Sequence, residues 1–250
     1  MAARLVEALS AAQSGVPIYK EIRRAMLARL AQGSWAPGTA IPSEARLKQE
    51  FGVAIGTIRK AVDELVAENI LIRQQGRGTF VATHNRDRLL FHFFHIERQD
   101  GYKEYPNVRM LDFERGRADA RVAAKLKLKE GERVLRFRNV LSLEGTQLML
   151  DDITLPEHLF PKLTEKRLRE RPSTLYNLYQ DDFGLSVVRT EQRLRAAIAP
   201  REVARALGLP AGLPMLEIHR VAFAYNDQPV EFRVSHVDTS GHDYVGDTRR

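Results

Sequence analysis

The chain repeats part of its own sequence at an offset of 81 residues, and this duplication limits its possible folds more than any other feature. The matching pairs are 123–128 with 204–209, 134–138 with 215–219, and 144–147 with 225–228. Each copy has the pattern of a short helix, a strand, a tight turn and another strand, and the period is longer than that of solenoid repeats. We therefore predict a duplicated half-domain whose strands pair into one antiparallel sheet with pseudo-twofold symmetry. A cleft between the two halves is a natural place for a ligand.

Residues 17–82 carry a different pattern, in which three predicted helices precede a predicted hairpin. In the first helix, apolar residues four apart are expected to face the core, namely Ile18, Ile22, Met26 and Leu30. The segment 42–44 begins a second helix that ends at 51–53, and a third helix follows it. Two short strands, 70–73 and 79–81, flank a glycine-rich tip. This order is that of a winged helix-turn-helix, in which the third helix enters the DNA major groove.

The third helix is expected to have a core face and a DNA face. Its core-facing residues, spaced four and three apart, are Ile58, Val62 and Leu65. Thr57, Arg59 and Lys60 are left on the other side. We expect Arg59 to read a base edge, because arginine is the commonest bidentate reader of guanine. We expect Thr57 to contact a phosphate or a thymine methyl, and Lys60 to contact a phosphate.

The tip of the hairpin places Arg77 between Gly76 and Gly78, so the backbone can come close to DNA. An arginine on such a tip fits a narrow minor groove. The alternative is an ordinary turn with a solvated arginine. The charge supports DNA contact, because residues 1–82 hold 11 Lys+Arg against 7 Asp+Glu in a chain whose net charge is +7.

Composition excludes several other classes of protein. The sequence has no cysteine, which excludes disulfides, thiolate metal sites and cysteine nucleophiles. No apolar run approaches the ~20 residues that a membrane span needs, and the N-terminus is too polar for a signal peptide. We expect a cytoplasmic protein without a cofactor. His92 and His95 invite a metal reading, but a strand end or a partner surface is the preferred one, and Phe91, Phe93 and Phe94 are assigned to a core or a dimer surface.

Over roughly 65 residues, the N-terminal module resembles the GntR family of bacterial transcription factors. The segments that carry the resemblance are 17–19, 37–38, 41–44, 51–53, 57–59 and 73–81. The resemblance implies a regulator that reads double-stranded DNA. The positions expected to contact DNA are Ser43, Arg46, Thr57, Arg59, Lys60, Gln75, Gly76, Arg77 and Gly78.

Two departures from the family pattern fall where arginines of the family touch DNA. Ala45 follows Pro-Ser-Glu where the family has an arginine, with Arg46 next, and Ala54-Ile55 stands where Ser-Arg is usual. We therefore expect an altered operator or weaker contacts to phosphates. Ala54 also removes the usual helix cap, at a cost of about 1 kcal/mol, and Gly56 weakens the first turn further. We expect this helix start to be loose until DNA is bound.

Residues 86–245 resemble the UTRA effector domain, which follows the DNA module in one GntR subfamily and has a fold like that of chorismate lyase. The segments that carry the resemblance are 136–138, 174–176, 206–208 and 229–231. In that subfamily, strand arginines, an acid on the next strand, a hydroxyl and a tyrosine at a helix start, and a late glutamate line the effector pocket. The resemblance therefore implies a pocket lined by Arg136, Arg138, Asp151, Thr174, Tyr176 and Glu231. Val237 stands where the subfamily usually has a tyrosine.

The strand that contains Arg136 and Arg138 supports an anionic effector on physical grounds. Both arginines point to one face of the strand, while Leu135 and Phe137 point to the other. Two guanidinium groups on an inward face are costly to bury without an anion or an acid, which suggests a carboxylate or phosphate effector. The alternatives are that Asp151 or Glu231 pairs with the arginines, or that the face is solvated.

The sequence thus predicts an α+β chain, with a winged helix-turn-helix domain joined to a chorismate-lyase-like antiparallel-sheet effector domain. The predicted segments are an extension at 1–14, the DNA-binding domain at 15–82, a linker at 83–90, and an effector-binding and dimerisation domain at 91–250. The predicted function is a homodimeric repressor on a palindromic operator, released by a small anionic metabolite. One alternative is a constitutive DNA-binding dimer whose second domain only joins subunits. A remote one is a lyase-like enzyme, for which no nucleophile and base are evident.

Overall fold

The computed structural model describes residues 16–84 and 92–246 of the chain, which divides into two compact units, Met1–Thr83 and His84–Arg250. The predicted extension at 1–14, most of the predicted linker at 83–90, and Phe91 lie outside the described residues. No helix among the described residues is long and apolar enough to cross a membrane.

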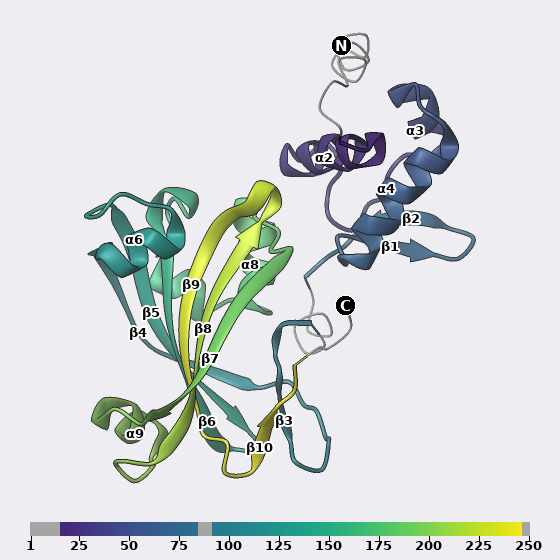
Figure 1. Cartoon of the computed structure of the whole chain (residues 1–250). Helices are drawn as coiled ribbons and strands as arrows, with labels where there is room; N and C mark the ends of the chain where they lie inside the picture. Colours follow the sequence, from purple (N-terminus) through teal and green to yellow (C-terminus); the bar gives the residue numbers. More distant parts are fainter. Residues whose placement is uncertain (1–15, 85–91, 247–250) are drawn as a thin grey trace. The chain divides into compact units, whose positions relative to one another are not determined.

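The first unit contains three helices followed by a two-stranded hairpin, in the predicted order (Figure 1). Its elements are α2 (Ile18–Ala31), α3 (Glu44–Phe51), α4 (Ile55–Ala67), β1 (Leu71–Gln74) and β2 (Gly78–Val81). β1 and β2 are antiparallel, and a bridge between Ala40 and Phe80 extends the pairing by one residue. This is a winged helix-turn-helix arrangement, with α3 and α4 as the helix pair and the hairpin as the wing.

Local sequence explains where these helices begin and end. The Ser43 side chain caps α3 by accepting from the backbone N–H of Arg46 at 3.3 Å, and Gly52 ends α3 with a left-handed φ of 65°. α4 begins after Ala54, which supplies no side-chain cap. In α2 the expected stripe is buried except for Ile18, which is 48% exposed because it is the first residue of the helix, ahead of the packed turns. The prediction that Ile18 is buried was therefore wrong.

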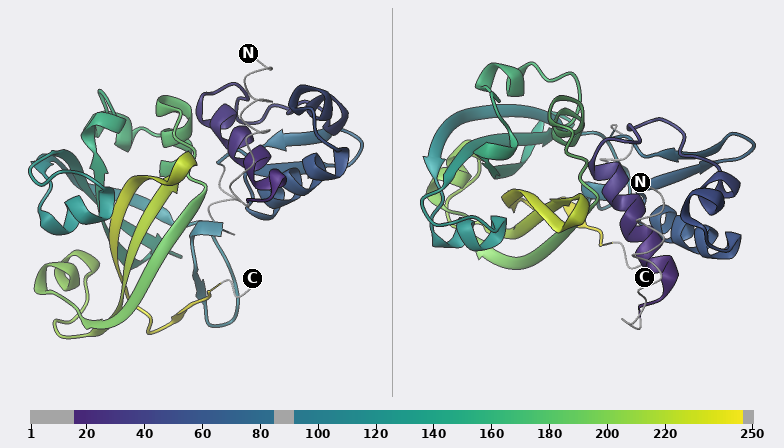
Figure 2. Two further views of the ribbon diagram at one scale, coloured as in Figure 1. Left: turned by 45° about the horizontal axis from the view of Figure 1, so that its top comes forward. Right: turned by 90° about the horizontal axis from the view of Figure 1, so that it is seen from above.

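The second unit is built around one strongly curved, six-stranded antiparallel sheet (Figures 1 and 2). Its strands run in the order β4-β5-β6-β9-β8-β7, and β3 and β10 form a separate antiparallel pair. The strands are β3 (Ile96–Arg98), β4 (Asn107–Arg117), β5 (Arg133–Leu143), β6 (Thr146–Pro156), β7 (Arg189–Ile198), β8 (Pro214–Ala224), β9 (Gln228–Val237) and β10 (His242–Tyr244). The helices are α6 (Ala120–Leu126), α7 (Glu165–Arg169), α8 (Leu175–Phe183) and α9 (Arg201–Leu207), with short 3₁₀ turns at Glu157–Leu159 and Tyr225–Asp227.

The predicted duplication is visible in the order and the bounds of these elements. β4-α6-β5-β6 in the first half corresponds to β7-α9-β8-β9 in the second, and α6 and β5 lie 81 residues before α9 and β8. The pairing of β6 with β9 joins the halves at the centre of the sheet. Each copy also contains a strand ahead of its helix, β4 or β7, which lies outside the segments matched by the repeat.

The two faces of the sheet carry different packing. α6 and α9 cover one face, which we call the outer face, through apolar clusters that include Val122, Val134, Val140 and Val203. The opposite, inner face packs against α8 in the largest cluster, which includes Phe137, Ile153 and Tyr179. Because neighbouring strand residues alternate between faces, the face of each polar side chain follows from these clusters.

Candidate nucleic-acid interface and ligand pocket

The exposed side of α4 is a narrow stripe that includes most of the predicted DNA-contacting positions of this helix. Thr57 is half-buried, and the exposed residues are Ile55, Gly56, Arg59, Lys60, Asp63 and Ala67. Ile58, Val62 and Leu65 are fully buried, as predicted. The ammonium group of Lys60 lies 4.1 Å from the centroid of the Tyr19 ring, so a cation–π contact restrains this lysine.

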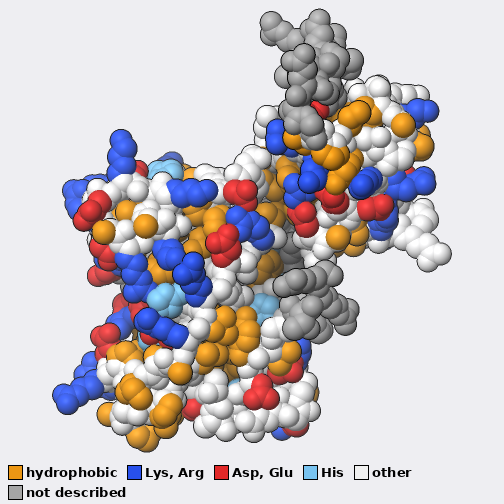
Figure 3. All heavy atoms as spheres, in the orientation of Figure 1, with side chains coloured by type: hydrophobic (Ala, Val, Ile, Leu, Met, Phe, Trp, Pro, Cys, Tyr) orange, Lys and Arg blue, Asp and Glu red, His pale blue; other side chains and the backbone are white. Residues whose placement is uncertain are grey.

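Glu44 links three elements of the first unit through one carboxylate. It accepts from Nε of Arg59 on α4 and from Nη2 of Arg73 on β1, each at 3.2 Å. Arg73 also pairs with Asp63 of α4. Acidic and basic side chains accordingly lie side by side on the visible surface of this unit (Figure 3). One carboxylate thus pairs with a predicted base-reading arginine on the exposed side of α4.

The remaining predicted DNA-contacting residues lie at the start of α3 and at the wing tip. Arg46 is exposed and pairs with Glu50 one turn later, at 3.2 Å. The tip residues Gln75, Gly76, Arg77 and Gly78 are all exposed, with left-handed φ values of 71° at Gly76 and 113° at Gly78. The Arg77 guanidinium lies 5.7 Å from the Phe80 ring centroid. The structure thus exposes these side chains, and their contacts with DNA remain predictions.

A pocket opens on the inner face of the sheet in the second unit. Both halves of the duplication contribute to it, as do the residues before β3, the start of α8, and β10. Its lining includes Asn139 and Asp151 from the first half, Arg220 and Arg233 from the second, and Tyr176 of α8. The space between its lining residues, open solvent at the mouth included, is about 660 Å³. Apolar side chains line the rest, among them Phe93, Phe94, Leu141, Met149 and Ile218.

One wall of this pocket is a buried ionic network centred on Arg233. Its guanidinium donates to Asp151 at 2.8 Å and to both carboxylate oxygens of Glu231 at 2.9 and 3.0 Å. Ser235 donates to the second oxygen of Asp151. Both carboxylates are almost fully buried, so each charge depends on the same arginine for compensation.

Two tyrosines of α8 complete the network. The hydroxyls of Tyr176 and Tyr179 donate to Glu231 at 3.3 and 2.7 Å. Burial raises the pKa of Tyr176 to about 12, and burial with the nearby Glu231 charge raises the pKa of Tyr179 well above its ordinary value. Both phenols are therefore protonated donors near neutral pH. Thr174 caps the helix that carries them, accepting from the backbone N–H of Asn177 at 3.0 Å.

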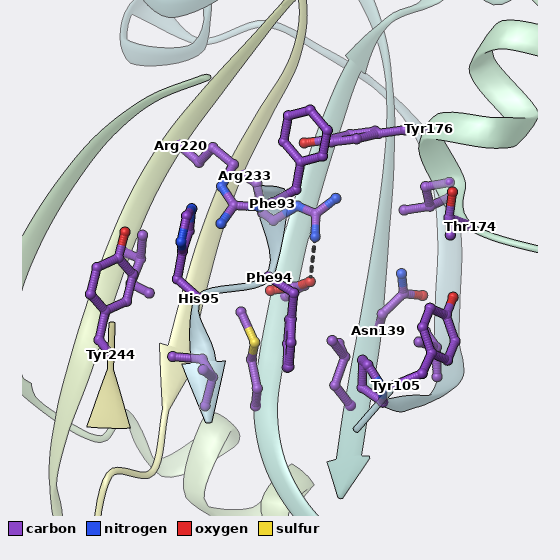
Figure 4. A pocket seen from close by; sticks show the side chains of 18 of the residues that line it. Phe93, Phe94, His95, Tyr105, Asn139, Thr174, Tyr176, Arg220, Arg233 and Tyr244 are labelled. Carbon is purple, nitrogen blue, oxygen red and sulfur yellow. Dashed lines mark hydrogen bonds and ion pairs between the residues drawn. The ribbon is translucent and has the colours of Figure 1, made fainter. Parts of the chain in front are cut away.

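Other polar groups at the pocket lack complete compensation. Arg171 and Arg220 have no carboxylate within ion-pairing distance in the described part of the chain, although Arg220 reaches Gln192 at 3.4 Å. The Nε atoms of both arginines and Oδ1 of Asn139 are buried without a hydrogen-bond partner among the described residues. Burial lowers the pKa of the Arg171 guanidinium. Figure 4 shows Arg220 and Arg233, partners in the β8–β9 register, on the same side of the pocket as Tyr176.

The prediction that Arg136 and Arg138 line this pocket was wrong. Both lie on the outer face of β5, where Arg138 pairs with Asp112, and Arg136 donates to the Arg117 carbonyl and pairs with Glu114. The alternation was correctly assigned, but the inner face is the one that carries Leu135 and Phe137. Basic and histidine side chains are visible on the outer face between α6 and α9 (Figure 3).

Of the other predicted effector-binding residues, Asp151, Thr174 and Tyr176 line the pocket, and Glu231 lies behind it as the partner of Arg233 and Tyr176. Sequence reasoning missed Arg171, Arg220, Arg233 and Asn139. The duplication contained a usable signal, because Asn139 and Arg220 are equivalent at the offset of 81 and alternate in step with inward apolar residues.

Both histidines singled out in the sequence, His92 and His95, lie among the described residues. No group of three or more potential ligands is present among residues 16–84 and 92–246. His95 lines the pocket, while Phe93 and Phe94 are buried in the two apolar clusters beside it. The core assignment of these two phenylalanines is confirmed.

Comparison with known proteins agrees with this geometry. The family model described as "Bacterial regulatory proteins, gntR family" matches residues 18–81. The family model described as "UTRA domain" matches residues 102–243. A probable fructoselysine utilization operon transcriptional repressor of Escherichia coli strain K12 is 31% identical over 218 residues, which cover 85% of this chain and 87% of that protein. The transcriptional repressor NagR of Bacillus subtilis strain 168 is 26% identical over 220 residues, 88% of this chain and 89% of that one.

Solved structures share the architecture. The ligand-binding domain of a GntR-family regulator from Bordetella bronchiseptica has a TM-score of 0.60 at 32% identity, covering 64% of this chain and 99% of that domain. The transcriptional regulator YydK of Bacillus subtilis has a TM-score of 0.55 at 19% identity over 92% of this chain and 99% of that one, which shows the fold. The predicted order of a helix-turn-helix region and an antiparallel-sheet domain is confirmed. The chain belongs to the GntR family of bacterial transcriptional regulators, and its second unit is a UTRA domain.

Proposed function

We propose that this regulator is a homodimeric repressor that leaves its operator when a small carboxylate-bearing metabolite occupies the pocket on the inner face of the sheet. The observation that carries the proposal is the pair of pocket arginines without a carboxylate partner, Arg171 and Arg220. A buried guanidinium without a counter-ion is costly, and a bound anion would remove that cost. Arg233 pairs with both Asp151 and Glu231 and forms part of the wall. The three arginines, Arg171, Arg220 and Arg233, exceed those two carboxylates by one positive charge, which one carboxylate of a ligand would balance.

The remaining lining supports a ligand with both polar and apolar parts. Asn139 offers a buried carbonyl oxygen that calls for a hydroxyl or amine donor on the ligand. Phe93, Phe94 and Ile218 accommodate an aliphatic stretch. Relatives are named for fructoselysine utilization, mannosyl-D-glycerate metabolism and histidine utilization. Each of those three compounds carries a carboxylate, which is consistent with the arginines found here.

A short path connects the pocket to the DNA-binding unit along the chain. His84 directly follows Thr83, the last residue of the first unit. It is buried, and its backbone N–H donates to the Gln180 side chain at 3.0 Å. The centroid of its ring lies 5.8 Å from those of Phe93 and Tyr176, which both line the pocket. A ligand that displaces these rings also displaces His84, from which the chain continues into the DNA-binding unit. Binding of the ligand would then favour the state in which the protein is released from DNA.

The test begins with selection of bound sequences from random duplex DNA by the purified full-length protein at a stated salt concentration. Release from the selected site is then measured with fructoselysine, mannosyl-D-glycerate and histidine, and with phosphorylated sugars as the contrasting anion. Arg171→Met and Arg220→Gln are compared with Arg167→Gln, an exposed arginine paired with Asp182 away from the pocket. We expect the first two variants to keep DNA affinity and to need at least tenfold more ligand for release.

Each outcome decides one element of the proposal. Enrichment of a palindrome supports the dimer, and enrichment of a single half-site contradicts it. If ligand releases Arg171→Met and Arg220→Gln from DNA at the same concentration as wild type, the effector binds outside this pocket. A carboxylate that binds in calorimetry without changing DNA affinity would mean a constitutive DNA-binding dimer, and release by phosphorylated sugars alone would overturn the carboxylate assignment.

A further inference from the structure

Three consecutive residues at the start of α4 do not favour the stability of the helix or of the folded unit. Ala54 provides no cap, Ile55 is 41% exposed, and Gly56 occupies the first turn. A Cβ on Gly56 would meet nothing within 4 Å, and the φ of this glycine is not positive, so the fold does not require glycine there. Alanine would favour the helix. Residues that lower stability without improving packing or hydrogen bonding in the protein itself are expected at sites where a partner binds.

The position of Ile55 indicates which partner it meets. It lies one turn before Arg59, on the same exposed stripe of the helix. Arg73 lies beside Arg59, because both pair with Glu44. An exposed apolar side chain beside arginines that can meet a polyanion is suited to an apolar group of that polyanion, and the major groove of DNA presents one, the C5 methyl of thymine.

We propose that Ile55 reads the methyl group of one thymine in each half-site, next to the base contacted by Arg59, and that Gly56 lets the helix start approach the DNA closely. The inference rests on the proposed reading of DNA by α4. Other bases are disfavoured at this position because an isoleucine cannot satisfy their groove-facing hydrogen-bonding groups. Cytosine would lose water from its amino group, and purines from N7, without a replacement partner.

Replacing thymine with deoxyuracil tests the inference, since this change removes only the methyl group. In the best sequence selected from random DNA, each thymine is replaced singly by deoxyuracil, and affinity is measured with the full-length protein. Wild type should lose about fourfold in affinity at one thymine per half-site, the value expected for one buried methyl. Substitution at the other thymines should have no such effect.

Variants separate this contact from general effects on the fold. Ile55→Ala should bind thymine and deoxyuracil sites equally. Ile18→Ala is the matched control, an exposed isoleucine in the first turn of another helix of the same unit, and it should keep the discrimination. Gly56→Ala should raise the melting temperature, because alanine favours the helix, and yet weaken DNA binding by about tenfold or more.

The outcomes distinguish this inference from the proposed function. Enrichment of a site at which no deoxyuracil substitution matters, or unchanged discrimination in Ile55→Ala, overturns the methyl contact and leaves DNA reading intact. Gly56→Ala with wild-type affinity overturns the close approach. No enriched sequence at all overturns the proposed operator recognition together with this inference.

Discussion

The two units hold their charges in opposite ways. In the first unit, Glu44 pairs with Arg59 and Arg73, whose side chains are 59% and 44% exposed. In the second, Asp151 and Glu231 are 1% and 0% exposed and share the nearly buried Arg233. Exposed pairs contribute about 0–1 kcal/mol and can exchange partners, whereas a buried network cannot lose a member cheaply. The first arrangement suits a surface that meets a polyanion, and the second suits the fixed wall of a pocket.

The largest effect is expected from breaking the buried network. Arg233→Ala leaves two buried carboxylates without compensation and should lower the free energy of unfolding by about 3–5 kcal/mol. Arg167→Ala, which removes the partner of Asp182 in an exposed pair, should leave the free energy of unfolding almost unchanged. Chemical denaturation of both variants checks the contrast. Equal losses would show that burial does not separate the two kinds of pair.

An intermediate effect is expected from His84→Ala, which removes the ring between the chain that leaves the first unit and the pocket residues Phe93 and Tyr176. Ligand affinity and DNA affinity measured separately should change little. The factor by which ligand weakens DNA binding should fall at least fivefold, within the usual range of coupling energies. DNA titrations with and without saturating ligand measure that factor, and an unchanged factor would exclude this path.

The smallest effect is expected from Glu44→Gln. The substitution removes a negative charge that faces DNA and releases Arg59 and Arg73. Affinity for random DNA should rise about twofold to fivefold, while the preference for the selected site should fall, because Arg59 is no longer oriented. The free energy of unfolding should change by less than about 1 kcal/mol. A gain in affinity with full preference retained would show that Glu44 only competes with DNA.

Much of the fold could be predicted because its signals are local or repeated. The duplication predicted one antiparallel sheet from two halves, and turn and cap residues such as Ser43 and Gly52 bound the helices as expected. The pocket could be predicted only in part. Strand alternation separated Arg136 from Phe137, but it cannot say which face turns toward α8. That choice depends on packing between elements that are distant in the sequence.

The ionic network of Arg233, Asp151 and Glu231 could not be predicted from the sequence for the same reason. Arg233 meets Asp151, 82 positions away, only because β6 and β9 pair in a register that places Ser235 opposite Asp151. Likewise, Glu44 reaches Arg73 across 29 positions once the hairpin folds back on α3 and α4. Residue type identified candidate cations and acids, whereas partnership was decided by tertiary structure.

The duplicated sheet also bears on how the regulator tells one metabolite from another. Two identical halves would form a pocket with the same groups at both ends, and such a pocket could not favour one orientation of a bound ligand. Asn139 and Arg220 occupy equivalent places in the two halves and have diverged to a neutral amide and a cation. Their strand partners in the pocket differ as well, Asp151 in the first half and Arg233 in the second, so the two ends of the pocket carry different groups. A ligand with one charged and one uncharged end is then bound in one orientation. An analogue whose charge lies at the opposite end is bound more weakly.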